Sequence, residues 1–308
     1  MADISTEICG VKLKNPMVLA SGIMGVTGSS LANVVSHGVG AVTIKSLGLK
    51  PRKGHSCPVI STFKSGMINA VGLSNPGINT GIKEIKKFKD LCDAPIIGSI
   101  FAFKRDGYGE LAKKISKAEP DLIEINVSCP NVEDEAGTPF ALDKKAVYKT
   151  TKITKKNTDI PVIVKLSPNS LNIKEIAQAC EKAGADAINM GNTLGPGLVI
   201  NIETARPILS NKFGGVSGPA IKPITMKRIW DIYDEVNIPI IGTGGASCGK
   251  DAIEMIMAGS SAVGIGSAVY YRGLDVFEKI NKEIKEFMEK NNYSSIKEMI
   301  GIAHESKL

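Results

Sequence analysis

Short apolar segments of strand type recur along the chain, and most are followed by a turn and an amphipathic helical stretch. The hydrophobicity within each segment is continuous rather than alternating, which indicates strands covered on both faces, as parallel strands are. We count eight such segments: Met17–Ala20, Ala41–Lys45, Pro95–Ile100, Leu122–Asn126, Pro161–Leu166, Ala187–Met190, Ile238–Gly242 and Ser261–Ile265. This alternation predicts an α/β fold, a (β/α)8 TIM barrel.

The segments between the predicted strands support this architecture. Helices are expected at Glu110–Ala118, Ile173–Ala183, Ile224–Glu235, Lys250–Ala258 and Asp275–Asn291. The chain is unusually long between strands 2 and 3 and between strands 6 and 7, which predicts long loop insertions after strands 2 and 6. Residues 4–15 read as an N-terminal hairpin that closes the bottom of the barrel. An open doubly wound sheet is the alternative fold, but Ser21–Gly25 does not match the glycine-rich turn such sheets carry.

Composition fits one large domain with a charged surface. The chain has 308 residues, 43% of them hydrophobic, and no linker divides it, so a single domain is predicted over residues 1–308. The formal net charge of +7 indicates either an anionic partner or a lysine-rich solvated surface. We favour the surface, because the lysines are spread along predicted helices, and no basic arm suggests nucleic acid.

Cysteine and histidine usage argues against metal centres in this chain. None of the six cysteines forms a C-x-x-C pair, and the three histidines are scattered, so no metal or iron–sulfur ligand set is expected. The sequence shows no secretory leader and no apolar run of the ~20 residues that would span a bilayer. These features predict a cytoplasmic protein with reduced thiols.

Polar residues and glycines lie in the last two positions of, or just past, nearly every predicted strand. They are Ser21, Lys45, Ser46, Ser99, Asn126, Cys129, Lys165, Asn192, Thr193, Gly244, Gly245, Gly266 and Ser267. Barrel enzymes assemble their sites where the carboxyl ends of the strands meet. The sequence therefore predicts one polar site at that end of the barrel.

Each group in this set has two interpretations. The glycine turns after strands 7 and 8 are either a phosphate cradle or ordinary turns. Lys45 and Lys165 face either an anionic ligand or a barrel carboxylate such as Glu124. Cys129, in a polar turn with Pro130, is either a base or nucleophile or a small buried residue. The scarcity of histidine favours Cys129 as the base.

Four motifs, in order along the chain, resemble the dihydroorotate dehydrogenase family. They are NAVGLSN at Asn69–Asn75, NVSCPN at Asn126–Asn131, GGVSGPAIKP at Gly214–Pro223 and IIGTGG at Ile240–Gly245. The resemblance implies an FMN-binding TIM barrel that oxidises dihydroorotate to orotate in de novo pyrimidine (UMP) biosynthesis. It also implies that the hydride passes to FMN, with one FMN per chain.

The resemblance assigns roles to individual residues. Cys129 would be the catalytic base, and Lys165 would lie near the flavin N1–C2=O edge, where a cation stabilises the reduced ring. The substrate would be held by Lys45, Asn69, Ala70, Val71, Gly72, Leu73, Asn126, Asn192 and Thr193. FMN would be held by Ser21, Lys45, Ser46, Ser99, Asn126, Lys165, Gly191, Gly218, Gly244, Gly245, Gly266 and Ser267.

Residues 192–194 and 215–219 resemble the NAD-linked type B (class 1) enzymes. That type implies a partner subunit carrying FAD and a [2Fe-2S] cluster, in a heterotetramer of two catalytic and two partner chains. Two alternatives are a fumarate-linked dihydroorotate dehydrogenase and a dihydropyrimidine dehydrogenase-like flavin reductase. A non-catalytic barrel that binds FMN or a phosphate ligand is the alternative outside the enzymes.

Overall fold

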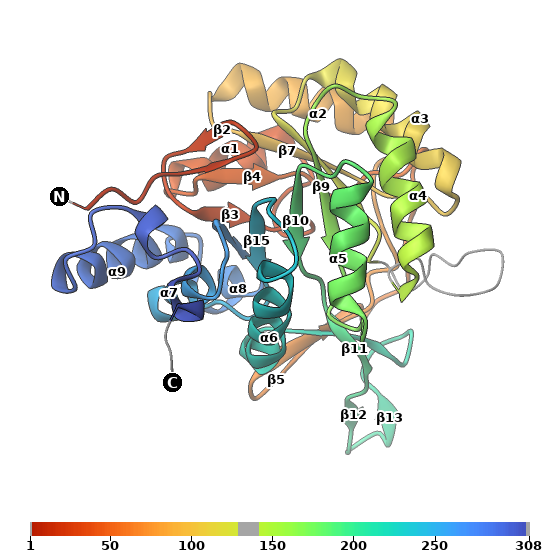
Figure 1. Ribbon diagram of the computed structural model, residues 1–308. Coiled ribbons are helices and arrows are strands. Elements are labelled where there is room, and N and C mark those ends of the chain that lie inside the picture. The colour runs from red at the N-terminus through yellow and green to blue at the C-terminus, as the bar shows by residue number, and fades with distance from the viewer. Residues whose placement is uncertain (1, 129–141, 306–308) are drawn as a thin grey trace.

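The computed structural model describes residues 2–128 and 142–305 and confirms the predicted barrel (Figure 1). Eight parallel strands close in the order β10-β15-β16-β3-β4-β7-β8-β9. Their bounds are β3 (Met17–Leu19), β4 (Ala41–Thr43), β7 (Ile96–Ile100), β8 (Leu122–Asn126), β9 (Val162–Leu166), β10 (Ala187–Met190), β15 (Ile240–Thr243) and β16 (Ala262–Ile265). Each of the eight predicted segments contains or overlaps one of these strands.

Helices cover the outside of the barrel. They are α1 (Gly28–Ser36), α2 (Ile78–Leu91), α3 (Arg105–Ile115), α4 (Lys144–Lys155), α5 (Ile173–Lys182), α6 (Lys222–Tyr233), α7 (Gly249–Met257), α8 (Ala268–Arg272) and α9 (Val276–Lys290). The predicted start of α3 at Glu110 is wrong, because the helix begins at Arg105, and the predicted end at Ala118 belongs to a short 3-10 turn, Ser116–Ala118. The other predicted helices differ from the structure by one or two residues at their ends.

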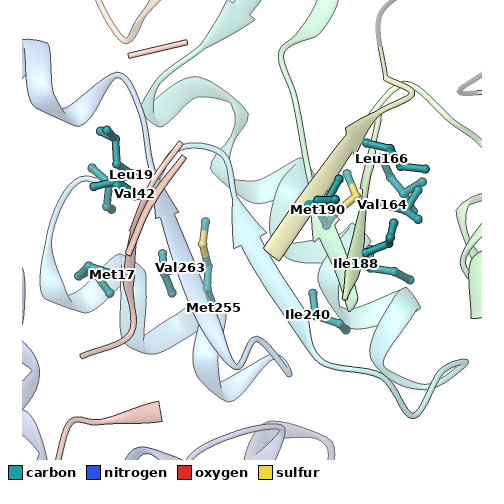
Figure 2. Packing of buried hydrophobic residues seen from close by; sticks show 14 of the residues in the cluster. Met17, Leu19, Val42, Val164, Leu166, Ile188, Met190, Ile240, Met255 and Val263 are labelled. Carbon is teal, nitrogen blue, oxygen red and sulfur yellow. The ribbon is translucent and has the colours of Figure 1, made fainter. Parts of the chain in front are cut away.

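Outward-facing strand residues pack against these helices. Figure 2 shows side chains of this layer, including Met255 of α7 near Val263 of β16 and Val164 near Leu166 on β9. All four side chains are fully buried. Residues two apart on a strand share a face, so these side chains account for the outward face of each strand. The strands are apolar without interruption because the face toward the barrel interior is buried as well.

The bottom of the barrel interior is an apolar layer closed by the N-terminal hairpin. One residue from each barrel strand contributes to this layer: Val18, Ala41, Ile97, Leu122, Ile163, Ala187, Ile241 and Ala262. Strands β1 (Thr6–Ile8) and β2 (Val11–Leu13) pair antiparallel, and Ile8 and Leu13 pack onto the same layer. The hairpin therefore seals the barrel floor, as predicted.

Two residues further along six of the eight strands, the interior changes from apolar to polar. We call this level the polar layer; it consists of Thr43, Ser99, Glu124, Lys165, Asn189 and Thr243. All six are buried, and they occupy the same face as the apolar layer because side chains alternate along a strand. The polar layer lies toward the carboxyl ends of the strands, where a ligand site is expected.

The two long insertions combine into a separate sheet that the sequence does not predict. Strands β5 (Ile60–Phe63) and β6 (Gly66–Asn69) come from the insertion after β4, and β11 (Leu194–Gly197) and β14 (Gly214–Ser217) from the insertion after β10. They form a four-stranded sheet in the order β11-β14-β6-β5. A small hairpin, β12 (Ile200–Asn201) with β13 (Arg206–Pro207), projects furthest from the barrel (Figure 1).

Candidate active site

A cavity of about 510 Å³ lies between the carboxyl ends of the barrel strands and the insertion sheet. Small-molecule sites commonly have volumes of about 300–1,000 Å³. The predicted site residues that line the cavity are Ser21, Lys45, Ser46, Asn69, Ala70, Val71, Gly72, Leu73, Asn126, Lys165, Gly191, Asn192, Thr193, Gly218, Gly244, Gly245, Gly266 and Ser267. The structure thus brings together residues that are far apart in the sequence.

Two predicted site residues are not in this lining. Cys129 lies outside the described residues, so its assigned role as base stays a prediction. Ser99 is fully buried beneath the cavity, where its hydroxyl lies 2.8 Å from Ser46 Oγ and donates to Glu124 Oε1 at 2.9 Å. Ser99 therefore supports residues of the site from below.

Four polar side chains, at or after the ends of β4, β8 and β10, form a directional hydrogen-bond chain. Asn192 Nδ2 donates to Ser128 Oγ at 2.5 Å, and Ser128 Oγ donates to Asn126 Oδ1 at 2.7 Å. Asn126 Nδ2 then donates to Ser46 Oγ at 3.3 Å. A carboxamide nitrogen has two hydrogens, and among residues 2–128 and 142–305 only one of those on Asn126 has an acceptor, so the second N–H group can donate to a ligand.

Lys165 reaches the cavity from the polar layer with a carboxylate beside it. Its Nζ lies 3.8 Å from Glu124 Oε1, so the ion pair considered from the sequence is present. Lys165 also lines the cavity, so the ion pair and contact with a ligand are compatible. The second lysine, Lys45, comes close to the loop after β3, since a Cβ at Gly22 would lie 3.5 Å from Lys45 Nζ.

The glycine turns that follow strands β15 and β16 differ in how closely they are packed. At Gly244 and Gly245 an added Cβ would lie 2.5 Å from Thr225 Oγ1 and 2.7 Å from Lys222 Cβ, so α6 packs too closely for a side chain. At Gly266 the nearest atom would be Ala20 Cβ at 3.8 Å, which leaves that backbone open toward the cavity. Packing against α6 explains the glycines of the first turn, whereas an added Cβ at Gly266 would meet only ordinary van der Waals contacts.

The Gly244–Gly245 turn is also supported by an ion-pair network. Lys222 Nζ lies 2.7 Å from both Asp251 Oδ1 and Glu254 Oε2, and Asp251 accepts from Ser247 N at 2.9 Å. Burial raises the pKa of the Asp251 carboxyl, but the hydrogen bonds from Lys222 and Ser247 outweigh it and hold that pKa below its usual range.

Several lining residues were not predicted. Asn169 accepts from Gly195 N at 3.0 Å, and His55 Nδ1 lies 3.1 Å from Ala70 O. Asn169 follows strand β9 by only three positions, so a wider reading past each strand end would have found it. His55 and Phe213 lie in the insertions, where no periodic pattern predicts which side chains face the cavity.

Two cysteines distant from the cavity are poor candidates for chemistry. Burial, and then the nearby Asp186 carboxylate, raise the pKa of Cys9 to about 12. Burial likewise raises the pKa of Cys180, which is fully enclosed by α5 and its neighbours. Such thiols stay protonated and are inert at neutral pH.

Within residues 2–128 and 142–305, no cluster of three or more His, Cys, Asp or Glu side chains has a geometry suited to a metal ion. Across the same ranges, no helix has both the length and the apolar character needed to cross a bilayer.

The fold and cavity define a TIM-barrel protein with a polar small-molecule site at the carboxyl end of its strands. A sequence model described as dihydroorotate dehydrogenase matches residues 3–288. The chain belongs to the dihydroorotate dehydrogenase family.

Among curated relatives, the chain is 47% identical over 305 residues to a protein of Methanocaldococcus jannaschii, which covers 98% of each chain. It is 41% identical over 302 residues to one of Methanothermobacter thermautotrophicus, covering 98% of this chain and 99% of the relative. Both relatives are named dihydroorotate dehydrogenase B (NAD(+)), catalytic subunit.

A solved structure, DHODH from Eimeria tenella in complex with ferulenol, superposes with a TM-score of 0.83. The superposition covers 99% of this chain and 89% of that one, at 22% identity, so it supports the fold alone.

Proposed function

We propose that this chain oxidises dihydroorotate to orotate in de novo pyrimidine biosynthesis, with FMN as the hydride acceptor. The observation that carries the proposal is the meeting of Lys45, Asn69, Asn126 and Asn192 in one cavity, in a chain of this family. Dihydroorotate presents a carboxylate, two ring carbonyls and two ring N–H groups. A lysine and three carboxamides supply the matching charge, donors and acceptors.

The residues present also fit FMN. Thr243 Oγ1 is buried, lines the cavity, and has no hydrogen-bond partner among the described residues, so a ligand atom would satisfy it. The open backbone at Gly266 and the hydroxyl of Ser267 lie after the eighth strand, where barrels commonly hold a phosphate. Ser21, Ser46, Gly191, Gly218, Gly244 and Gly245 would complete the binding site, and Lys165 would face the ring.

The chain's own residues divide the work of the reaction. Bound FMN supplies the two-electron acceptor chemistry. Lys45 would bind the substrate carboxylate. Asn126 Nδ2 donates one hydrogen to Ser46, and its second N–H group would donate to a ring or carboxylate oxygen of the substrate. Cys129 would take the proton from the ring carbon. Its neighbour Ser128 is hydrogen-bonded to both Asn126 and Asn192, and these two asparagines line the cavity.

The names of the relatives support the NAD-linked type, with a separate electron-transfer subunit. We propose that a partner subunit carrying a [2Fe-2S] cluster and FAD would take the electrons one at a time through the cluster and deliver them as a hydride from FAD to NAD, in a heterotetramer of two catalytic and two partner chains. A cytoplasmic location and a single domain over residues 1–308 are part of the same proposal.

Anaerobic mixing of purified, FMN-loaded protein with dihydroorotate tests the proposal. Loss of the flavin absorbance band is the expected result, with dihydrouracil as the control that leaves the protein yellow. Bleaching by dihydrouracil alone would favour a dihydropyrimidine reductase instead. Bleaching followed by rapid reoxidation with fumarate would favour the fumarate-linked type, and protein unable to take up FMN would refute the flavoenzyme assignment.

A further inference from the structure

Glu124 and Lys165 form a buried ion pair directly beneath the cavity. Glu124 is 1% exposed, and the Lys165 side chain is 6% exposed. They lie on the adjacent strands β8 and β9 in the polar layer, with Lys165 Nζ 3.8 Å from Glu124 Oε1. Since buried opposite charges are weakly screened, each changes the electrostatic potential that the other produces in the cavity.

Hydrogen bonds hold both oxygens of the Glu124 carboxylate. Ser99 Oγ donates to Oε1 at 2.9 Å, and Asn189 Nδ2 donates to Oε2 at 2.6 Å. These donors come from β7 and β10, so four neighbouring strands fix the carboxylate relative to Lys165. A carboxylate buried this completely needs such partners, because an unpaired charge in the interior is costly.

We infer that Glu124 is a positioning residue for Lys165 and sets how strongly the Lys165 ammonium stabilises the reduced flavin. The inference rests on the proposed function, because it requires flavin in the cavity that Lys165 lines. An ammonium near the flavin ring favours the reduced, anionic form. The Glu124 carboxylate offsets part of that effect and directs the ammonium, which keeps the flavin reducing enough to pass its electrons on.

Glu124→Gln removes the charge while the hydrogen bonds can persist. The glutamine oxygen would accept from Asn189, and its nitrogen would donate to Ser99 Oγ. The Ser99 hydroxyl would then turn to Ser46 Oγ, which lies 2.8 Å away and can act as donor or acceptor. The substitution therefore tests the charge with little change in shape.

The test is the midpoint potential of bound FMN, measured by anaerobic reductive titration of the FMN-loaded protein with a reference dye. Glu124→Gln is expected to move the potential to a more positive value. The matched control is Asp186→Asn, which changes the net charge by the same amount. Asp186 lies immediately before β10, pairs with Lys155 and does not line the cavity. No shift is expected there. An unchanged potential in Glu124→Gln would overturn the inference.

A second comparison tests whether Glu124 acts through Lys165. In a Lys165→Met background the Glu124 carboxylate has no ammonium to position or to offset. Glu124→Gln should then leave the potential unchanged, and an equal shift in both backgrounds would refute action through Lys165.

Two further outcomes are also decisive. If Glu124→Gln does not fold, Glu124→Asp tests the inference instead. Its shorter side chain moves the carboxylate away from Lys165, so the midpoint potential of bound FMN should again become more positive. An unshifted potential in Glu124→Asp would overturn the inference. Failure of the proposed function is recognised separately, in wild-type protein that does not bind FMN or is not reduced by dihydroorotate.

Discussion

Gly215 of β14 lies so close to Thr193 that an added Cβ would be 2.0 Å from Thr193 Oγ1. Gly215 is also paired with Asn69 of β6, and both Asn69 and Thr193 line the cavity. Gly215→Ala would displace Thr193 and is expected to weaken orotate binding at least about tenfold, a loss of about 1.4 kcal/mol. Spectral titration of the flavin with orotate measures this effect.

The control for that experiment is Ser61→Ala, on the outer strand β5 of the same sheet and outside the cavity lining. It should bind orotate as the wild type does. FMN content should stay normal in both variants, and an unaltered orotate affinity in Gly215→Ala would show that Thr193 does not contribute to the substrate site.

Cys129→Ser is expected to retain FMN and orotate binding but to slow flavin reduction by dihydroorotate by orders of magnitude at neutral pH. A thiol ionises near pH ~8.5, whereas a hydroxyl is a far weaker acid and needs a separate base. Stopped-flow absorbance under anaerobic conditions gives the rate. Cys57→Ser, at an exposed cysteine that does not line the cavity, is the control, and a normal rate in Cys129→Ser would remove Cys129 from the mechanism.

Ile8→Ala should destabilise the protein by about 2–5 kcal/mol, because it opens a void between the N-terminal hairpin and the apolar layer. Ile8 is fully buried, whereas Ile202 on the projecting hairpin is 84% exposed. Ile202→Ala should therefore change stability by less than about 0.5 kcal/mol. Urea denaturation of both variants gives the difference, and equal midpoints would contradict the sealing role of the hairpin.

The network around Asp251 predicts a pH-dependent contribution to stability. The folded-state pKa of Asp251 is lowered, so its stabilisation is present above the unfolded value of about 3.9 and is lost as pH falls through the folded value. Asp251→Asn should cost about 1 kcal/mol at pH 7, a modest value because the network is partly exposed.

Denaturation at several pH values measures this contribution. The difference between wild type and Asp251→Asn should be constant from pH 7 to about 5 and should shrink below about pH 4. Asp159→Asn, at an exposed position outside the network, should match the wild type throughout. A difference that grows as the pH falls would contradict the assigned direction.

Local patterns made the barrel predictable and left the insertion sheet hidden. A strand buried on both faces is apolar throughout, so Val162–Leu166 was recognisable even though it contains Lys165. The pairing of β6 with β14 depends on contacts between residues such as Ile68 and Val216, and no local periodicity encodes a contact of that separation. The α3 start was missed because Arg105–Gly109 is polar and glycine-rich.

The site was predictable where strand ends converge. Asn126 ends a barrel strand, Lys45 and Asn192 lie two residues past one, and all three line the cavity. Ser99 was assigned to FMN, but it is the last interior residue of β7 below the cavity, a depth that sequence position alone does not give. Glu124 appeared in the sequence only as a possible partner for lysine, and its clamping by Ser99 and Asn189 required the structure.

The joining of the two insertions orders events during synthesis of the protein. Ribosomes deliver a chain from its N-terminus, and β6, at residues 66–69, has its partner β14 only at residues 214–217. Strands β5 and β6, which form one half of the sheet above the cavity, must therefore wait for β14 until more than two-thirds of the polypeptide has been made. Capture of a ligand is thus a late event in biogenesis, and a nascent chain stalled before residue 214 has no complete compartment for it.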